Sequence, residues 1–451
     1  MILSTKLFFA LAIGISCSVF AQEEMTPLGN AVANVSPDTS SQEFTPIDST
    51  ARDVNNHTGI SSAVTPPAVF SDSVEMTPAH CDVTKNPYNL PCELLPLWNS
   101  MTMKQKAGQM VMVYMTPANF MIKNEFGGYL VMKNHLKDLE KFKTNIQTVN
   151  KELLIPPVVA MDQEGGRVNR ISAISPKWEK TPSAKAMRKM EADSVKALAA
   201  RIAEQMSNIG VNMNLAPVLD PAVDSRGQQS FMEESDRSWG SDTSNAFKVR
   251  AFVDGMRQHG IACVSKHFPG YDSWTNSDHQ IAVSATPKKK ISQNIRFFKT
   301  LSKDIPVTMM SSVRFTRVSN RPAVFEPEIV QKARDMNPET VILTDDLWGV
   351  SLRAWVSGTE RVKSKNYPAK DFKKLVQTAL MAGNDMFMIT FPRKAVDMVN
   401  YLTVMSNQSD LYKKRVEESS ARILNMKYRA GILKPEELRL NENATENKTE
   451  N

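Results

Sequence analysis

The chain has 451 residues, of which 41% are hydrophobic and 23% are charged, a balance that excludes fibrous and multi-span membrane proteins. Its formal net charge is +7, but the stretch from Gln22 to Thr84 holds nine acidic residues and one basic residue, so the remainder is strongly basic. A basic body favours anionic partners such as nucleic acid, a membrane surface or an acidic polysaccharide, and charge alone does not choose among them.

The first 21 residues read as a secretory signal peptide. One lysine precedes an apolar run, and Val19-Phe20-Ala21 resembles a cleavage site. The run is too short for a permanent transmembrane helix. We therefore expect an exported protein, periplasmic or extracellular, without a transmembrane segment. Cys17 leaves a lipid anchor as a minor alternative, because the three residues before it make a poor lipobox.

The segments on either side of the central domain have biased compositions. Residues 22–90, rich in Ser, Thr, Pro and acid, are expected to form a disordered leader, and residues 434–451 a disordered tail. Residues 91–433 hold the expected folded domain. Export implies an oxidising compartment, which makes Cys81 and Cys92 a candidate disulfide. No Cys/His cluster has metal-ligand spacing, so we expect neither a metal nor a cofactor.

Short apolar runs alternate with helix-like segments through the folded domain. The predicted strands are Gln109–Tyr114, Gly128–Met132, Val158–Met161, Asn212–Ala216, Ala262–Ser265, Val307–Ser311, Val341–Thr344 and Met386–Ile389. The predicted helices include Leu136–Glu152, Ser194–Ile209, Ala246–His259, Ile291–Lys303 and Phe372–Ala382. Eight alternations favour an α/β fold of the (β/α)8 TIM-barrel type. A doubly wound sheet is the alternative, because short apolar runs are ambiguous.

Polar and charged residues directly follow several of the apolar runs. They are Asp162, Glu164, Asp220, Lys266, His267, Asp345 and Asp346. In a barrel these positions face the C-terminal mouth, where catalytic groups gather. Their clustering favours the barrel over the doubly wound sheet.

Three segments of the chain carry residues suited to catalysis. Asp345 or Asp346 can supply a nucleophile or base, and a pair of helix N-caps explains the same segment equally well. Lys266 and His267 at a strand end are hydrogen-bond donors for hydroxyl-rich or anionic ligands. His279, in a polar loop, can deliver a proton near neutral pH when a carboxylate orients it, although an isolated loop histidine more often has no catalytic role.

Several segments, in their order along the chain, resemble the motifs of glycoside hydrolase family 3. They are Met101–Lys106, Gly108–Met110, DQEGGRV (Asp162–Val168), APVLD (Ala216–Asp220), DRSWG (Asp236–Gly240), KHFPG (Lys266–Gly270), TDDL (Thr344–Leu347) and AGNDM (Ala382–Met386). The resemblance covers roughly Leu97 to Leu433, including a closing helix Val416–Lys427. The loop ending in His279 is similar to that of the β-N-acetylglucosaminidase (β-N-acetylhexosaminidase) branch.

The resemblance implies a single-domain barrel enzyme that removes terminal β-linked N-acetylglucosamine with retention of configuration. Matched motif by motif, Asp345 stands at the position of the nucleophile and His279 at that of the general acid/base. The positions that hydrogen-bond the sugar in the −1 subsite are those of Asp162, Arg237, Lys266 and His267.

The chain departs from the family pattern around the acid/base. The usual Asp-Ser-His triplet is Ser277-Asp278-His279 here, so the aspartate that normally orients the histidine is displaced. Either Asp278 or Asp272 then partners His279, or proton donation is impaired. The usual Ala-His pair after the sixth strand is Ser311-Ser312.

The leading interpretation is a secreted retaining exo-β-N-acetylglucosaminidase acting on peptidoglycan fragments, whose carboxylates suit a basic enzyme. Another exo-glycosidase of the family, acting on chitooligosaccharide, β-glucoside or β-xyloside, is the first alternative. A catalytically weakened barrel that only binds glycan is the second; the displaced loop aspartate supports it and the intact Asp345 opposes it. No nucleic-acid motif accompanies the positive charge, so we expect a carbohydrate partner, no nucleic acid, and a monomer.

Overall fold

The computed structural model describes residues 86–360 and 367–438. The predicted signal peptide, most of the predicted leader and Cys81 lie outside the described residues. Cys92 lies inside them and is disulfide-bonded, while its pairing with Cys81 stays a prediction.

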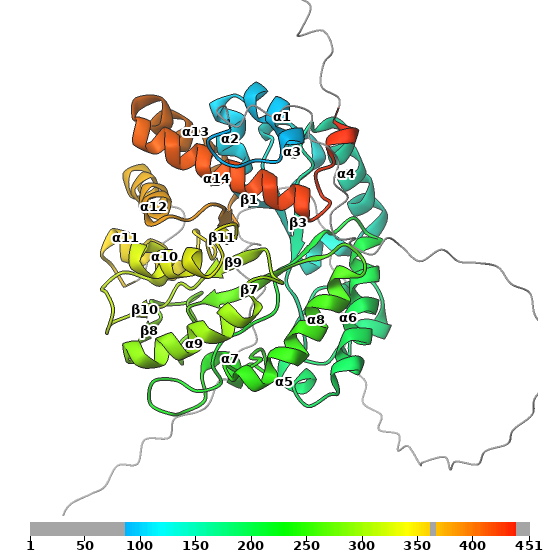
Figure 1. The fold of residues 1–451 in the computed structure, drawn as a ribbon, viewed down its shortest axis with the longest axis vertical. Coiled ribbons are helices and arrows are strands. Elements are labelled where there is room, and N and C mark those ends of the chain that lie inside the picture. Colours follow the sequence, from blue (N-terminus) through cyan, green and yellow to red (C-terminus); the bar gives the residue numbers. More distant parts are fainter. Residues whose placement is uncertain (1–85, 361–366, 439–451) are drawn as a thin grey trace, which may run out of the picture. The chain divides into compact units, whose positions relative to one another are not determined.

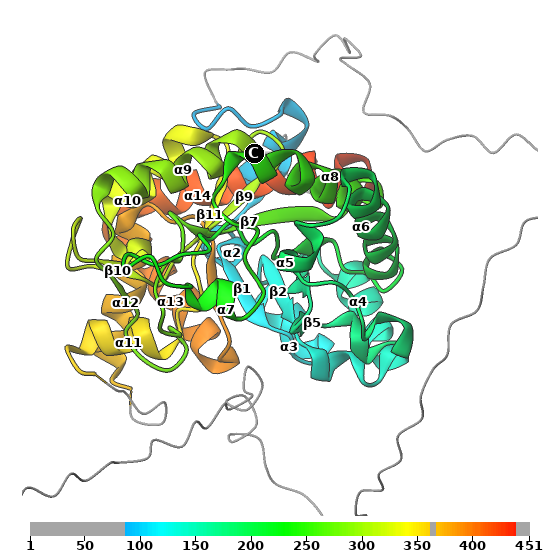
Figure 2. The same ribbon diagram turned by 90° about the horizontal axis from the view of Figure 1, so that it is seen from below.

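Within the described residues, eight parallel strands form one sheet that closes into a barrel (Figure 1, Figure 2). The strands are β1 (Val111–Tyr114), β2 (Gly128–Val131), β3 (Val158–Met161), β6 (Met213–Asn214), β7 (Ala262–Phe268), β9 (Val307–Met310), β11 (Val341–Leu343) and β12 (Phe387–Ile389). Their order in the sheet is β11-β9-β7-β6-β3-β2-β1-β12. A parallel bridge between Leu343 and Met386 joins its two ends. The predicted TIM barrel is confirmed, and the doubly wound sheet is excluded.

Each predicted apolar run matches one barrel strand, and seven of the eight contain their strand in full; β7 instead continues beyond the predicted Ala262–Ser265 to Phe268. Parallel strands are covered on both faces, so their sequences read as continuous apolar stretches that stand out from the flanking segments. The first run differs at its start, since Gln109 is the last residue of helix α2 and the strand begins at Val111.

Helices cover the outside of the barrel, and Figure 2 shows α4, α6, α8, α9 and α10 following one another around the strands. The longer ones are α4 (Leu139–Glu152), α6 (Ala192–Ser207), α8 (Ala246–Arg257), α9 (Lys288–Leu301), α10 (Pro327–Met336), α11 (Val350–Ser357), α12 (Ala369–Ala382), α13 (Pro392–Gln408) and α14 (Asp410–Arg429). The shorter ones are α1 (Leu95–Ser100), α2 (Met103–Gln109), α3 (Ala118–Asn124), α5 (Ala184–Met187) and α7 (Phe231–Glu234). The five predicted helices correspond to α4, α6, α8, α9 and α12, and the closing helix to α14. Throughout residues 86–360 and 367–438, every helix is too short or too polar to cross a bilayer.

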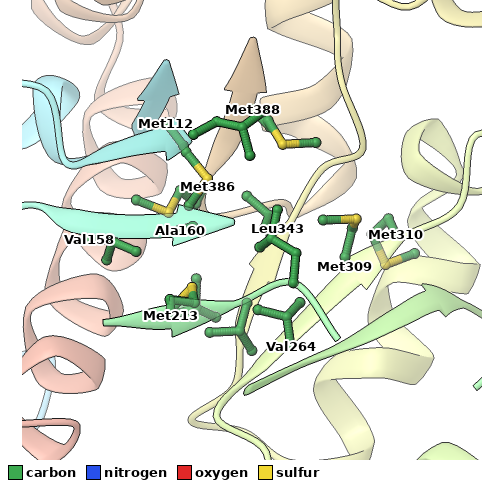
Figure 3. Packing of buried hydrophobic residues seen from close by; sticks show 14 of the residues in the cluster. Met112, Val158, Ala160, Met213, Val264, Met309, Met310, Leu343, Met386 and Met388 are labelled. Atoms are coloured by element: carbon green, nitrogen blue, oxygen red, sulfur yellow. The ribbon is translucent and has the colours of Figure 1, made fainter. Parts of the chain in front are cut away.

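The barrel interior is filled largely by methionine. Figure 3 shows the side chains gathered between the strands. They include Met112, Met213, Met309, Met386 and Met388, all buried, beside smaller residues such as Ala160 and Val264. An unbranched thioether chain adapts to irregular gaps, so methionine fills the spaces that branched side chains occupy in most barrels of this type.

A buried carboxylate ties the last strand to the C-terminal helix. Asp385, two residues before β12, accepts hydrogen bonds from the backbone N of Ile342 (2.9 Å), Ser419 Oγ (3.0 Å) and Arg422 Nη1 (3.0 Å). Arg334 of α10 also pairs with it. Burial opposes ionisation of Asp385, but the arginine cations outweigh it and hold its pKa low. The aspartate of the AGNDM motif is therefore part of the closure of the barrel.

A short hairpin beyond β3 shapes the mouth. Strand β4 (Gln163–Gly165) pairs antiparallel with β5 (Val168–Asn169). Gly165 has φ +84°, and a Cβ there would lie 2.0 Å from the carbonyl oxygen of Pro182. Only glycine fits this turn, which sets the carboxylates on either side of Gln163 at the end of β3. A second small sheet joins β8 (Val283–Ser284) and β10 (Arg314–Phe315) in parallel.

The ends of the described chain pack against a small apolar cluster beside the barrel. Leu90, at the end of the predicted leader, is buried there, and Leu438 packs against the same cluster. Pro435–Glu437, inside the predicted tail, forms a 3-10 turn. Residues 439–451 lie outside the described residues.

Candidate active site

The sequence-predicted site residues lie at the C-terminal ends of barrel strands. Asp162 follows β3, Lys266 and His267 lie in the last part of β7, and Asp345 follows β11. Because parallel strands end at the same face, these side chains meet at one mouth. Arg237 reaches this mouth from the loop after α7.

Five oppositely charged side chains form a network of ion pairs at this mouth. We call this network the mouth cluster; its members are Asp162, Glu164, Arg170, Arg237 and Lys266. Lys266 Nζ lies 2.6 Å from Asp162 Oδ1 and 2.7 Å from Glu164 Oε1. Arg237 forms a fork onto Glu164, with Nε–Oε2 and Nη2–Oε1 distances of 2.8 and 2.9 Å. Arg170 Nη2 lies 3.8 Å from Asp162 Oδ2. Two parallel hydrogen bonds of this kind orient the guanidinium of Arg237 relative to the carboxylate of Glu164, in addition to the attraction between their charges.

The cluster keeps its members ionised although it is buried. Burial opposes the charge of Glu164, but Arg237 and Lys266 outweigh it and hold the pKa of Glu164 far below its usual range. For Asp162 the cations of Lys266 and Arg170 likewise outweigh burial, and its pKa is lowered. The carboxylates in turn raise the pKa of Lys266 against the effect of burial. The mouth therefore presents fixed charges over the whole neutral range.

Asp220 holds the other part of the KHFPG segment. Its Oδ2 lies 2.7 Å from His267 Nδ1, and its Oδ1 accepts the backbone N–H groups of His267 (2.8 Å) and Tyr271 (2.6 Å). A carboxylate on Nδ1 places the proton there, which leaves Nε2 as the remaining polar atom of the ring. One aspartate thus fixes both the ring of His267 and the start of the following loop.

The adjacent carboxylates Asp345 and Asp346 are divided between two roles. Ser312 Oγ donates to Asp345 Oδ2 at 2.7 Å, and the backbone N of Asp346 donates to Asp345 Oδ1 at 2.8 Å. Asp346 instead accepts from Thr390 Oγ1 (2.6 Å) and from the backbone N of Trp348 (2.9 Å). Burial raises the pKa of Asp346 to about 6, and the charge of Asp345 adds to the effect. Asp346 therefore anchors the turn, whereas Asp345 is held at the mouth by Ser312 Oγ and a backbone N–H.

The loop from Tyr271 to His279 presents the predicted acid/base at the surface. His279 is exposed, and its ring makes no hydrogen bond or ion pair with another described residue. Asp272 is buried and accepts a hydrogen bond from the hydroxyl of Thr286 instead. Asp278 keeps contact with solvent, yet partial burial, followed by the charge of Asp345, raises its pKa. Of the two carboxylates considered as partners, Asp278 is the one electrostatically coupled to both His279 and Asp345.

Sequence reasoning assigned no role to Glu164, Asp220, Ser312 or Thr390 in this site. Glu164 and Asp220 were visible as polar residues after apolar runs, and this signal did mark them. Ser312 was visible only as a departure from the family motif, and the contact with Asp345 gives it a role. Among the described residues, no group of three or more His, Cys, Asp or Glu side chains is arranged to hold a metal ion.

The model of the glycosyl hydrolase family 3 N terminal domain matches residues 102–426, more than half of the chain. The chain belongs to glycosyl hydrolase family 3. It is therefore a glycoside hydrolase, and its mouth cluster, Asp220 pair and Asp345 all fall within the matched segment.

Similar proteins are named β-hexosaminidase. One from Idiomarina loihiensis is 26% identical over 274 residues, which cover 58% of this chain and 76% of the relative. One from Haemophilus influenzae is 26% identical over 332 residues, covering 68% and 88%. Among solved structures, a β-N-acetylhexosaminidase from Beutenbergia cavernae aligns with TM-score 0.62 and 22% identity over 74% of this chain and 99% of its own. A family 3 β-N-acetylglucosaminidase from Paenibacillus gives TM-score 0.62 and 21% identity over 74% of this chain and 63% of its own.

Glu164→Gln tests whether the mouth cluster positions the family 3 site. The change leaves Lys266 and Arg237 without their shared charge, so we expect kcat/KM to fall about 100-fold through misplacement of both cations. The free energy of unfolding should fall by about 3–5 kcal/mol, because buried charges lose a partner. Glycosidase kinetics and denaturant unfolding measure the two effects.

Glu233→Gln is the matched control, since Glu233 is buried against Arg188 (2.9 Å) and Lys185 (3.2 Å), which are not members of the mouth cluster. Equal kcat/KM in both variants would contradict the positioning role.

Asp346→Asn tests the protonation of the turn anchor. Burial raises its folded pKa to about 6, above the ordinary aspartate value of 3.8, so the aspartate stabilises the fold below about pH 4, and this stability is lost as the pH rises through 6. The unfolding free energy of the wild type minus that of the variant should therefore fall between about pH 4 and pH 7 in urea titrations. Asp397→Asn, at a partly exposed ion pair with Lys394 on α13, is the control. A difference that stays constant with pH would show that Asp346 does not hold a proton in the folded state.

Proposed function

We propose that this family 3 chain is a retaining exo-β-N-acetylglucosaminidase that removes terminal β-linked N-acetylglucosamine from peptidoglycan fragments. The observation that carries the proposal is Asp345, whose two carboxylate oxygens are held at 2.7 and 2.8 Å by Ser312 Oγ and a backbone N–H beside the mouth cluster. The relatives named β-hexosaminidase support the choice of sugar.

In this mechanism Asp345 attacks the anomeric carbon while the leaving oxygen takes a proton. The bond to the aglycone breaks as the bond to Asp345 Oδ forms, giving a glycosyl-enzyme ester. Water then attacks the same carbon from the face that the aglycone left and releases the sugar with its configuration retained. The hydrogen bonds from Ser312 and the backbone N of Asp346 orient the carboxylate for the first step.

The mouth cluster is suited to hold the sugar ring. Lys266, Arg237 and Asp162 offer donors and an acceptor to ring hydroxyls, and their mutual ion pairs hold them in place before a substrate arrives. Fixed partners remove the entropic cost of ordering the site during the reaction. His267, held by Asp220, adds a further polar contact.

His279 is the proposed proton donor, and it becomes the base that activates water in the second step. Its ring has no fixed partner among the described residues, so we assign Asp278 as the carboxylate that pairs with it when the loop closes on a substrate. The two side chains already interact electrostatically, although no hydrogen bond joins them in the structure.

The natural substrate and the location follow from the charge and the N-terminal sequence. The excess of basic residues after Lys85 suits the lactyl and peptide carboxylates of muropeptides. Export of the chain, inferred from residues 1–21, would bring the enzyme to that substrate. A barrel that binds glycan without cleaving it is the second candidate, favoured by the exposed ring of His279, which has no hydrogen-bond partner within residues 86–360 and 367–438.

Hydrolysis of 4-nitrophenyl N-acetyl-β-glucosaminide by the purified protein tests the proposal. We expect turnover in the wild type, its loss in Asp345→Ala, and a fall of about 10²–10⁴-fold in His279→Ala, the usual size of a general acid/base contribution. His259→Ala is the control. His259 follows the C-terminal end of α8 and has no place in the proposed site, so the rate should stay unchanged.

The pattern across substrates separates the alternatives. Turnover of β-glucoside or β-xyloside with an inert N-acetylglucosaminide would assign another family 3 exo-glycosidase. Wild-type rates no higher than those of Asp345→Ala on every glycoside would leave the binding-only barrel.

A further inference from the structure

One tryptophan of the chain lies at the surface of the catalytic face. Of the tryptophans that the structure describes, Trp274 is the exposed one, with 58% of its surface accessible, whereas Trp98, Trp178 and Trp239 are buried. Tryptophan is strongly buried on average, because exposing its large apolar ring to water is unfavourable. An exposed ring at this position therefore points to a ligand.

Trp274 belongs to the loop that carries the proposed acid/base. It precedes Asp278 by four residues, a length of chain that spans at most about 14 Å. Asp278 is coupled electrostatically to Asp345 and Arg237. The backbone N of Ser351, in the segment that follows Asp345, donates to the carbonyl oxygen of Ser277 in the same loop (3.3 Å). The loop that carries Trp274 therefore borders the segment of Asp345.

Hydrogen bonds fix this part of the loop relative to the sugar-binding residues. The backbone N of Tyr271 shares Asp220 Oδ1 with His267. The hydroxyl of Tyr271 donates to the carbonyl oxygen of Thr275 (2.5 Å) and accepts from the backbone N of Ser277 (2.8 Å). Tyr271 therefore holds the residues that directly follow Trp274. The indole ring of Trp274 is exposed on a turn that these hydrogen bonds fix.

A neighbouring loop supports the ring from one side. The guanidinium of Arg226 lies 5.4 Å from the centroid of Trp274. Asp224 holds Arg226, with Nη2–Oδ2 and Nε–Oδ2 distances of 2.7 and 2.8 Å. Because Asp224 neutralises that charge, Arg226 serves to brace the ring and does not supply a free cation for an anion. Val223, also exposed, extends the apolar surface on the same loop.

We propose that Trp274 is the platform on which the leaving-group sugar stacks, in the +1 subsite. The inference rests on the proposed glycosidase function. In a retaining glycosidase the acid/base stands on the leaving-group side, so the loop that carries it borders the aglycone. The C–H face of a pyranose ring is apolar and matches an aromatic face, while its hydroxyls stay in water.

Two substrates with the same −1 sugar isolate this contact. N,N′-Diacetylchitobiose has a pyranose aglycone, and 2-acetamido-2-deoxy-β-glucosyl fluoride has none. We expect Trp274→Ala to lower kcat/KM for the disaccharide about tenfold and to leave that for the fluoride nearly unchanged, with Trp274→Phe in between. Phe247→Ala, which removes an exposed aromatic ring (55% accessible) on α8, is the matched control and should affect neither substrate.

The outcomes keep the two proposals apart. An equal fall on both substrates would show that Trp274 acts on loop structure or chemistry, and no fall on either would show that the ring contacts no aglycone; both results overturn the inference and leave the glycosidase function intact. A wild type inert on both substrates overturns the proposed function and the inference together. In Asp345→Asn protein, diacetylchitobiose should quench tryptophan fluorescence, and Trp274→Phe in that background should abolish the change. Quenching that persists would place the ligand elsewhere.

Discussion

The ion pairs among Glu164, Lys266 and Arg237 are the constraint on which the mouth of the barrel depends. A buried charge is tolerable only when partners satisfy it, and here each partner comes from a different part of the chain. Glu164 stands on the hairpin after β3, Lys266 on β7 and Arg237 on the loop after α7. These elements must therefore assemble in one relative position, and the same position holds Asp162 against Lys266 at the mouth where Asp345, the proposed nucleophile, also lies. The stability of the charges and the geometry of the site have a common origin.

The site combines side chains that are held by protein partners with an exposed histidine on a loop. The mouth cluster, the Asp220 pair and the two hydrogen bonds to Asp345 are complete without a ligand. The loop that carries the proposed acid/base is braced by Tyr271, whereas His279 at its end is exposed. This division suits a reaction in which the sugar is recognised before the proton is delivered, because the loop can complete its contacts on the bound aglycone.

The sequence predicted the barrel well for a physical reason. Strands buried on both faces have to be apolar throughout, so the runs at Val158–Met161 and Val341–Thr344 are visible without any structure. Helices α10 and α13 were not predicted, although each begins with a proline in its first turn, which is a favoured position for proline at a helix start.

The site was predicted in part. Asp345 and the proposed sugar-binding positions follow from motifs, but the different hydrogen bonding of Asp345 and Asp346 depends on contacts with Ser312 and Thr390, which follow β9 and β12. The role of Glu164 likewise depends on long-range contacts. Its position in the sequence shows a carboxylate after an apolar run, but not its ion pairs with Lys266 and Arg237. Long-range pairing of this kind has no local signal in one sequence.

The most direct test of the account is to trap the covalent intermediate. The protein would be incubated with a 5-fluoro derivative of N-acetyl-β-glucosaminyl fluoride, in which the electronegative fluorine slows release of the enzyme-bound sugar, and then digested and analysed by mass spectrometry. The account predicts one added sugar on the peptide that contains Asp345, and none in Asp345→Asn. A sugar attached to Asp278 or Asp346, or normal turnover of the fluoride without any adduct, would contradict a double displacement at Asp345.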